Sequence, residues 1–286
     1  MAITLNSNIV SLRAQTRLGR TDLAINKTYE KLSSGLRINS AADDAAGLAI
    51  ADDLRSKIRV GQVAVRNAND GISTVAIADG ALSEIGGVLA RLAELAEQSA
   101  TGTFSAIQRS ALQSEFSALG SEIERIAQTT EFNGVKILSS SGTVTVQVGF
   151  DSTSNSQISF SNVLGTLAGI GLAAAGTSAL TYSISDNTLD LSQSASRNAL
   201  DAVNAAIQSV AQVRGGLGAT ESRLRLAISN LGVARENFAA AESRIRDLDI
   251  AEEAANLTRL TILQNAGAAV LAQANQAPAL ALKLLS

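Results

Sequence analysis

Apolar residues recur at alternating spacings of three and four along most of the chain, which is the period of packed helices. The longest such run keeps this spacing for about six heptads, from Leu200 to Ile245. A second run, from Leu112 to Ile126, is shorter but has fewer interruptions. A third run extends from Leu54 to Leu89, where several glycines lower the helical propensity. Coiled-coil seams are recognised from three or four heptads, so the pattern predicts long packed helices.

Two further helices are expected, one near each end of the sequence. Good helix formers extend from about Leu5 to Leu32, and Ser33-Ser34-Gly35 is a stop signal. The other helix, from about residue 246 to residue 285, is nearly uncharged and apolar around much of its circumference beyond Ala266. Such a helix needs cover on all sides, which one narrow partner helix cannot supply. The simplest alternative is a single bundle whose own core contains every stripe, but neighbouring copies of the chain would cover the terminal helix better.

The middle of the chain, between Val135 and Leu191, has a different character. Asn133-Gly134 is a strong hairpin-turn signal. Val144, Val146 and Val148 alternate with polar residues, as in a half-buried strand. Residues 157–160 and Thr181-Tyr182-Ser183-Ile184 repeat this alternation more weakly. The expected fold is therefore mainly α, with long antiparallel or coiled-coil-like helices and a small β-hairpin region in the middle of the chain.

The composition excludes several classes of function. The sequence has no His and no Cys, so thiol nucleophiles, histidine relays and nearly all zinc sites are ruled out. Three pairs of adjacent acidic residues remain, Asp43-Asp44, Asp52-Asp53 and Glu252-Glu253, but neighbouring positions on a helix point in different directions. A net charge of −3 gives no reason to expect nucleic acid as a partner. We expect no catalytic residues, no metal and no cofactor.

The start of the sequence lacks the basic and apolar pattern of a cleavable signal peptide. From Leu260 to Leu282 the chain carries no charge, which could mimic a membrane span. Five carboxamides interrupt that stretch and would be costly in lipid: Gln264, Asn265, Gln273, Asn275 and Gln276. We therefore expect a helix buried against protein rather than a membrane span. A pore-forming helical protein, which would release dye from vesicles, is the alternative from another class.

Three blocks of the sequence carry a specific resemblance. Residues 31–50, KLSSGLRINSAADDAAGLAI, resemble very closely the amino-terminal signature of bacterial flagellins. Residues 130–138, TEFNGVKIL, resemble the family's exit from its second core helix. The ending, from Ser243-Arg244-Ile245 to Gln264-Asn265-Ala266-Gly267, is similar to the family's carboxy-terminal core. The resemblance covers about residues 1–140 and 190–286.

The resemblance implies a structural subunit that self-assembles into a hollow, helical flagellar filament for swimming. It implies terminal helices of an inner tube with their linker in residues 1–42 and 243–286, an outer helical core in 43–138 and 190–242, and a short β or loop excursion in 139–189. The subunit would be exported without a cleavable signal peptide to an extracellular flagellum, and would lack the large outer domains of longer flagellins. A hook–filament junction protein, which has similar terminal helices, is the alternative.

The resemblance also assigns residues and partners. Copies of the chain would meet at the inner tube, through Leu5, Ile9, Leu12, Leu257, Leu260, Leu263, Val270 and Leu271. The linker signature comprises Leu32, Ser33, Gly35, Arg37, Asn39, Asp43 and Asp44. Expected partners are an export chaperone at the carboxy-terminal segment, the export apparatus, and the cap and hook-junction proteins. An innate immune receptor of animals would contact Arg91, Leu95 and Glu115. Detection should be weaker than in strongly detected members, since Ala90 and Ala93 replace polar or basic side chains common there. The alternative is that Leu95 is a core residue and Arg91 forms a surface pair.

Overall fold

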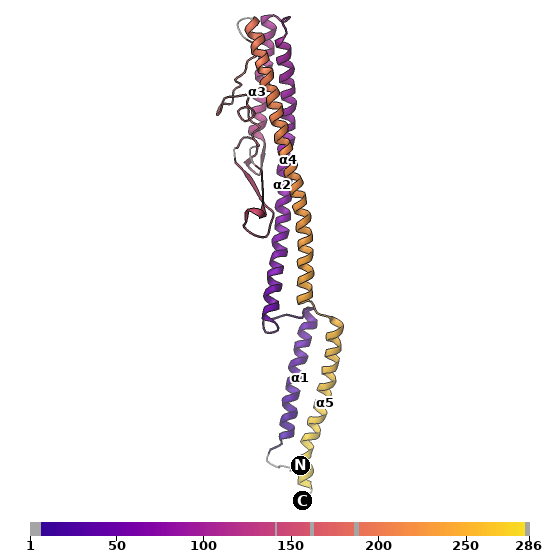
Figure 1. Cartoon of the computed structure of the whole chain (residues 1–286). Coiled ribbons are helices and arrows are strands. Elements are labelled where there is room, and N and C mark those ends of the chain that lie inside the picture. Colours follow the sequence, from indigo (N-terminus) through magenta and orange to yellow (C-terminus); the bar gives the residue numbers. More distant parts are fainter. Residues whose placement is uncertain (1–6, 141, 161–162, 186–188, 284–286) are drawn as a thin grey trace. The chain divides into compact units, whose positions relative to one another are not determined.

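The computed structural model describes residues 7–140, 142–160, 163–185 and 189–283, without the side chains of residues 189–191 and 277–283. Within these residues it has five long helices, which are α1 (Ile9–Ser34), α2 (Ala45–Ala100), α3 (Ala106–Thr129), α4 (Leu189–Arg246) and α5 (Ile250–Lys283) (Figure 1). Four short strands and one 3-10 turn lie between α3 and α4, namely β1 (Glu131–Phe132), β2 (Val135–Lys136), β3 (Val144–Gln147), η1 (Ser154–Ser156) and β4 (Gln157–Phe160). The mainly α fold with a small β region in the middle of the chain is confirmed.

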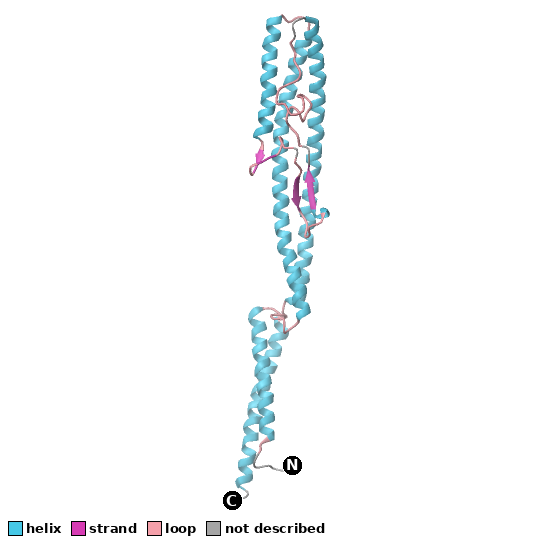
Figure 2. Ribbon diagram, turned by 90° about the vertical axis from the view of Figure 1, so that its left-hand side faces the viewer, coloured by secondary structure: helices cyan, strands magenta, loops and turns pink. Residues whose placement is uncertain are grey.

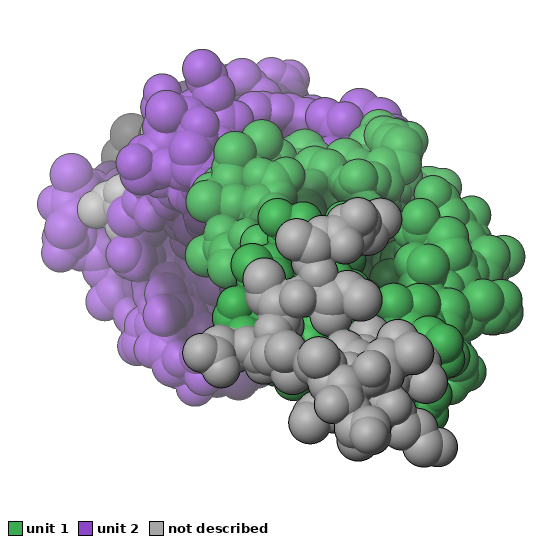
Figure 3. All heavy atoms as spheres, turned by 90° about the horizontal axis from the view of Figure 1, so that it is seen from below, with its two compact units in different colours: residues 1–58, 235–286 green, residues 59–234 purple. Residues whose placement is uncertain are grey.

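The chain forms two compact units (Figure 3). Unit 1 comprises residues 1–58 and 235–286, and unit 2 comprises residues 59–234. The helices α2 and α4 contribute residues to both units. The division into inner-tube and outer-core segments concerns an assembled polymer and stays a prediction.

The ends of the helices are set by local capping groups. The predicted stop after α1 is confirmed, because Gly35 takes the left-handed conformation, with φ 70°, and donates its N–H to the carbonyl of Lys31. Asp44 accepts from the amides of Ala46 and Gly47 at the start of α2, at 3.1 and 2.9 Å. Ser105 and Gln108 form a reciprocal capping box at the start of α3.

The core of unit 2 is a seam of aliphatic side chains. On α2 the fully buried stripe includes Leu82, Ile85, Leu89 and Leu92. The facing residues come from α3, from α4 and from the loops after β4, and include Phe116, Ile123, Val203, Leu217, Leu224, Leu167 and Leu172. Among the described residues, only α2 is long and apolar enough to fit a membrane span, with a mean hydropathy of 1.4 over its most apolar window. One stripe of α2 lies in this core, and 33% of that window is buried.

A buried arginine closes the turn between α2 and α3. Arg109 is 2% exposed, and its guanidinium donates to the carbonyls of Ser99, Thr101 and Phe104. These carbonyls lie at and just beyond the end of α2, where helix C-termini leave acceptors unsatisfied. The guanidinium N–H groups of Arg109 therefore take the place of the backbone donors that the next helical turn would have supplied.

Two antiparallel β ribbons pack beside the helices of unit 2 (Figure 2). The predicted Asn133-Gly134 turn joins β1 to β2, with both residues at positive φ, 51° and 76°. β3 pairs with β4 in the register Val144↔Phe160. An added Cβ on Gly71 of α2 would lie 2.9 Å from a methyl carbon of Val146, so this ribbon approaches α2 closely.

The weak alternation at residues 181–184 lies in a loop and not in a strand, which is the second of the two interpretations of this region. The backbone of Ile184 bonds to side chains instead of to a strand: its N–H donates to Gln113 Oε1 at 2.7 Å, and its carbonyl accepts from Ser99 and Ser196. The Ile184 side chain is fully buried. The alternation of apolar and polar residues there reflects a loop that covers the end of the helices.

Candidate functional site

The helices α1 and α5 pack along one another as an antiparallel pair within unit 1 (Figure 1). Polar side chains fix their register, through Asn8 Nδ2 to Ala274 O at 2.8 Å, Ser11 Oγ to Asn275 Oδ1 at 2.7 Å, and Gln264 Nε2 to Asp22 Oδ1 at 2.7 Å. Gly267 approaches Leu18, whose methyl carbon would lie 3.4 Å from an added Cβ. The pair is therefore specified by hydrogen bonds at one end and near its middle.

The pair buries little of its own apolar surface. On α1 the buried residues are Ser11, Ile25 and Thr28, of which only Ile25 is aliphatic. Exposed apolar residues remain on both helices, namely Ile9, Val10, Leu12, Leu23 and Tyr29 on α1 and Ile250, Ile262, Leu263 and Val270 on α5. Exposed apolar surface of this extent is typical of protein–protein contacts.

The residues expected to contact other copies lie on these helices. Ile9, Leu12, Leu263 and Val270 are each more than half exposed, at 53, 64, 51 and 56%. Leu257, Leu260 and Leu271 are half-buried, and Leu5 lies outside the described residues. Their contacts with another copy stay a prediction.

The linker from α1 to α2 is bonded to the short linker from α4 to α5. Arg37 N–H donates to the carbonyl of Arg246 at 2.7 Å, and Leu248 N–H donates to the carbonyl of Gly35 at 3.1 Å. Leu36 and Asp247 form an isolated antiparallel bridge. Two segments about 200 positions apart in the sequence thus form one bonded junction.

Side chains of the linker signature complete this junction. The Arg37 guanidinium donates to the carbonyls of Ile245 and Arg244 at the end of α4. Asn39 donates from its amide to Glu30 at 2.7 Å, and Ile38 is buried, with 3% of its surface exposed. Leu32 is half-buried and Ser33 is exposed. Within the signature, Gly35 and Arg37 contact the α4–α5 turn, whereas Asn39 contacts α1.

Asp43 holds the linker against α1. Its Oδ1 lies 2.6 Å from Lys27 Nζ, and its Oδ2 accepts from the amides of Asn39 and Ser40 at 3.2 and 3.1 Å. The bond from Lys27, followed by the two amide bonds, holds the pKa of the Asp43 carboxyl well below its usual range. The same bond raises the pKa of the Lys27 ammonium.

Sequence reasoning missed the partners of these residues. Lys27 pairs with Asp43, and Arg246, whose side chain is 14% exposed, lies 3.5 Å from Asp52. Asp22 and Gln264 pair across the two terminal helices. In the sequence these residues look like ordinary charged or amide residues of helices and of a linker. Nothing beside them in the sequence identifies their partners.

The three residues assigned to receptor contact lie in unit 2. Arg91 bonds Glu115 and Glu94 on the surface, at 2.8 Å in each case. Leu95 is fully buried in the core. The two charged residues are accessible, whereas Leu95 supports the helix from inside, and receptor contact stays a prediction for all three.

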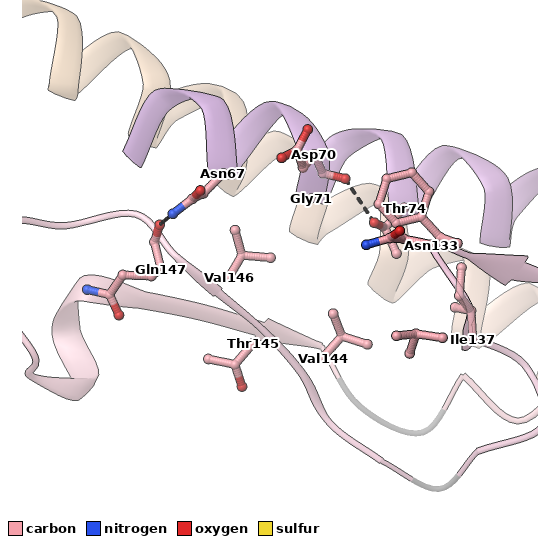
Figure 4. A pocket seen from close by; sticks show the side chains of 12 residues that line it. Asn67, Asp70, Gly71, Thr74, Asn133, Ile137, Val144, Thr145, Val146 and Gln147 are labelled. Carbon is pink, nitrogen blue, oxygen red and sulfur yellow. Dashed lines mark hydrogen bonds between the residues drawn. The ribbon is translucent and has the colours of Figure 1, made fainter. Parts of the chain in front are cut away.

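An open, mostly apolar pocket of about 380 Å³ lies between α2, the β1–β2 hairpin and β3 (Figure 4). Asn67 spans its rim, donating from its side-chain amide to the carbonyl of Gln147 at 3.2 Å. Asp70 is its only charged lining residue. Among the described residues, no group of three acidic side chains could hold a metal ion. The pocket contains no nucleophile paired with a base and offers no chemistry.

Residues 5–143 match the family model of the bacterial flagellin N-terminal helical region, and residues 200–285 match that of the C-terminal helical region. The chain is similar to a flagellin of Halalkalibacterium halodurans, with 42% identity over 98% of this chain and 99% of the relative. It is 40% identical to the flagellar filament 33 kDa core protein of Treponema phagedenis and to the flagellin of Bacillus subtilis, over the same shares of each chain. A crystal structure of Bacillus cereus flagellin aligns with a TM-score of 0.48 and 23% identity, over 58% of this chain and 88% of that one.

Proposed function

This chain belongs to the bacterial flagellin family and is a structural subunit of the extracellular flagellar filament, not an enzyme, and we propose that its α1–α5 pair makes the contacts between copies. The observation that carries this proposal is the exposed apolar surface of the pair. Ile262 and Leu23, at 62 and 71% exposure, lie on α5 and α1, where Ile25 and Ala274 are the buried hydrophobic residues among the side chains that the structure describes. Nothing in the sequence comparisons favours a hook–filament junction protein.

The α1–α5 pair gains little stability from folding on its own, and this couples its folding to assembly. Burial of apolar surface contributes roughly 25 cal/mol per Å², so two helices that bury so few side chains gain little from folding alone. Contact with neighbouring copies buries the remaining apolar residues and orders the pair at the same time. We therefore expect residues 1–33 and 247–286 to be sensitive to protease in dilute monomer and resistant in filaments. Equal resistance in both states would contradict this coupling.

Electron microscopy tests the proposal directly. The full chain is dissociated by heat and reassembled on short filament seeds at moderate salt, beside a variant that lacks residues 257–286. We expect long hollow filaments from the full chain and none from the truncated one. Filaments of normal length from the truncated variant would show that the α1–α5 pair is not the contact surface.

The remaining partners follow from the family in the same way. We propose that an export chaperone binds the exposed apolar face of α5 before assembly, and that the chain passes the export apparatus and the cap and hook-junction proteins without cleavage of a leader. Binding of the chaperone should be lost when residues 257–286 are removed. Amino-terminal sequencing of subunits from isolated filaments tests the absence of cleavage.

We also propose weak recognition by an innate immune receptor of animals at the accessible Arg91–Glu115 pair. This proposal is supported by the exposure of both side chains, each 44% accessible.

A further inference from the structure

One face of α1 is lined with basic side chains. Arg13, Arg17, Arg20, Lys27 and Lys31 follow one another at spacings of four, three, seven and four. At 3.6 residues per turn, these spacings place all five on one stripe. The residues of α1 that contact α5, among them Ser11, Leu18 and Asp22, lie on the opposite side of the helix.

The three arginines of this stripe are unused within the described part of the chain. Arg13, Arg17 and Arg20 are exposed, and none of their guanidinium groups has a hydrogen-bond or ion-pair partner among the described residues. Lys27, further along the same stripe, does have a partner, which is the carboxylate of Asp43. The stripe therefore already binds one carboxylate through Lys27 and leaves the three arginines available for others.

Acidic side chains gather at the start of α5. Asp249 caps the helix by accepting from the amides of Ala251 and Glu252. Glu252 and Glu253 lie in its first turn and line a shallow surface depression with Asn256 and Arg259. Arg259 donates to Asn256, not to either glutamate. The surface of Glu252 and Glu253, which we call the acidic patch, thus keeps its negative charge.

Within one chain, the arginines cannot reach this acidic patch. The bonds of Asp22 with Gln264 and of Ser11 with Asn275 fix the antiparallel register of the pair. In that register the arginines lie beside uncharged turns of α5, and the patch lies about 16 residues further along the axis. At 1.5 Å per residue this separation is about 24 Å, well beyond side-chain reach.

We propose that the Arg13–Arg17–Arg20 stripe of one copy binds the acidic patch of a second copy, displaced by about 24 Å along the axis of the helical pair. The proposal rests on the α1–α5 pair being the contact surface between copies. Charge complementarity selects the partner, since opposite charges across an interface fix register and speed association. The apolar residues beside the stripe supply non-directional attraction, whereas the charges determine which stagger is adopted.

Charge reversal and its compensation test the pairing. The stripe variant carries R13E, R17E and R20E, the patch variant carries E252K and E253K, and a combined variant carries all five changes. We expect each of the first two to raise the critical concentration for seeded elongation about tenfold at low salt, as for several weak surface pairs together, and the combined variant to recover most of this loss. The deficits should shrink near 1 M salt, where the Debye length is about 3 Å. No recovery in the combined variant overturns the proposal.

Two controls separate pairing from other effects. The variant R66E/R197E/R223E makes the same change of charge at three exposed arginines of unit 2 and should elongate normally, so an equal deficit there contradicts the proposal. The milder R13Q/R17Q/R20Q variant keeps good helix formers in α1 and should show a smaller deficit of the same salt dependence. If it shows none, the stripe makes no electrostatic contact.

A cysteine pair gives a direct readout, because the chain has no cysteine of its own. Under mild oxidation, filaments of the R17C/E252C variant should give a ladder of covalent multimers, since a disulfide requires Cα atoms within about 7 Å. Dilute monomer and both single variants should give no ladder. A ladder missing in filaments overturns the pairing alone, whereas normal filaments from the truncated chain lacking residues 257–286 would overturn the proposed contact surface itself.

Discussion

Arg37 donates from its guanidinium to the main-chain carbonyl of Ile245, with 3.2 Å between Nε and the oxygen, although 208 positions separate the two residues. The carbonyl belongs to the last turn of α4, where no intrahelical donor is available. A basic side chain at this point also interacts favourably with the helix dipole. One residue of the α1–α2 linker therefore caps the helix that leads into α5, and both terminal helices depend on the same junction.

Replacing Arg37 with Ala should loosen this junction. The carbonyls of Ile245 and Arg244 lose their charged donor, which we expect to cost about 1 kcal/mol of stability, the size of a net hydrogen bond. Hydrogen exchange of the Arg37 and Leu248 amides in filaments should become faster. Arg55→Ala, at an exposed arginine of the same unit, is the matched control. Unchanged exchange in Arg37→Ala would contradict a capping role.

The Asp43–Lys27 bond should make the linker resistant to moderate acid. The folded pKa of Asp43 lies below its unfolded value, which is about 3.9. Its contribution to stability is therefore fully present above about pH 4 and is lost only as the pH falls from there through the lower folded value. Carboxyl-carbon NMR of labelled filaments should show Asp43 still ionised at pH values where ordinary aspartates have become protonated.

Lys27→Met supplies the matching variant for this titration. Loss of the ammonium should raise the pKa of Asp43 toward its usual value, while the amides of Asn39 and Ser40 still hold it somewhat lower. Lys57→Met removes a similar surface pair, with Asp53, and should not move the titration of Asp43. An ordinary pKa for Asp43 in the unmodified filament would show that the contact is not maintained.

The long helices could be predicted from sequence because their stabilising contacts repeat along the chain. Phe116, Ile123 and Leu224 lie at the expected positions of their stripes and are fully buried. The Asn133-Gly134 turn was equally predictable, since its conformation depends on two adjacent residues that tolerate positive φ. The spacing of apolar residues was sufficient to predict the helices, and the backbone preference of two residues was sufficient to predict the turn.

The linker junction could not be predicted, because its contacts join segments that have no common period. Nothing near Arg37 indicates that its acceptor is a carbonyl of α4, and nothing near Asp43 distinguishes its partner from the other basic residues of α1. Arg109 has the same character, since a buried cation satisfied by carbonyls resembles a surface arginine in sequence. The loop at Ile184 has a related cause: side chains of α2, α3 and α4 satisfy its backbone, and alternation alone cannot distinguish such a loop from a strand.

Substitutions at Leu23 and Ile25, both on α1, should distinguish effects on assembly from effects on folding of the α1–α5 pair. Leu23 is 71% exposed, so Leu23→Asn should leave the α1–α5 pair intact and remove apolar surface that another copy would bury. We expect a critical concentration about ten to a hundred times higher, since a fully buried leucine contributes about 1.5–3 kcal/mol. Ile25 is 7% exposed, and Ile25→Asn should weaken the pair itself, with lower helix content in filaments by circular dichroism. A normal critical concentration for Leu23→Asn would exclude this face from the interface.

Arg91 and Leu95 should affect receptor activation for different reasons. Arg91→Ala breaks exposed ion pairs with Glu94 and Glu115, which costs less than about 1 kcal/mol, so its thermal unfolding should be nearly unchanged. If the receptor contacts this side chain, activation of receptor-expressing cells by the monomer falls. Leu95→Ala instead leaves a cavity in the core of unit 2 and should cost about 2–5 kcal/mol. Its loss of activation should follow the fraction of unfolded protein as temperature rises.

Arg125→Ala is the control for the Arg91 experiment, because it removes a surface ion pair of the same kind, with Glu122, on the neighbouring helix α3. It should change neither thermal unfolding nor receptor activation. If Arg91→Ala behaves like Arg125→Ala, the accessible pair on α2 and α3 is a structural ion pair and not a receptor contact. If only Arg91→Ala loses activation, the contact lies on the exposed charges, and the buried Leu95 contributes by holding α2 in its helical conformation.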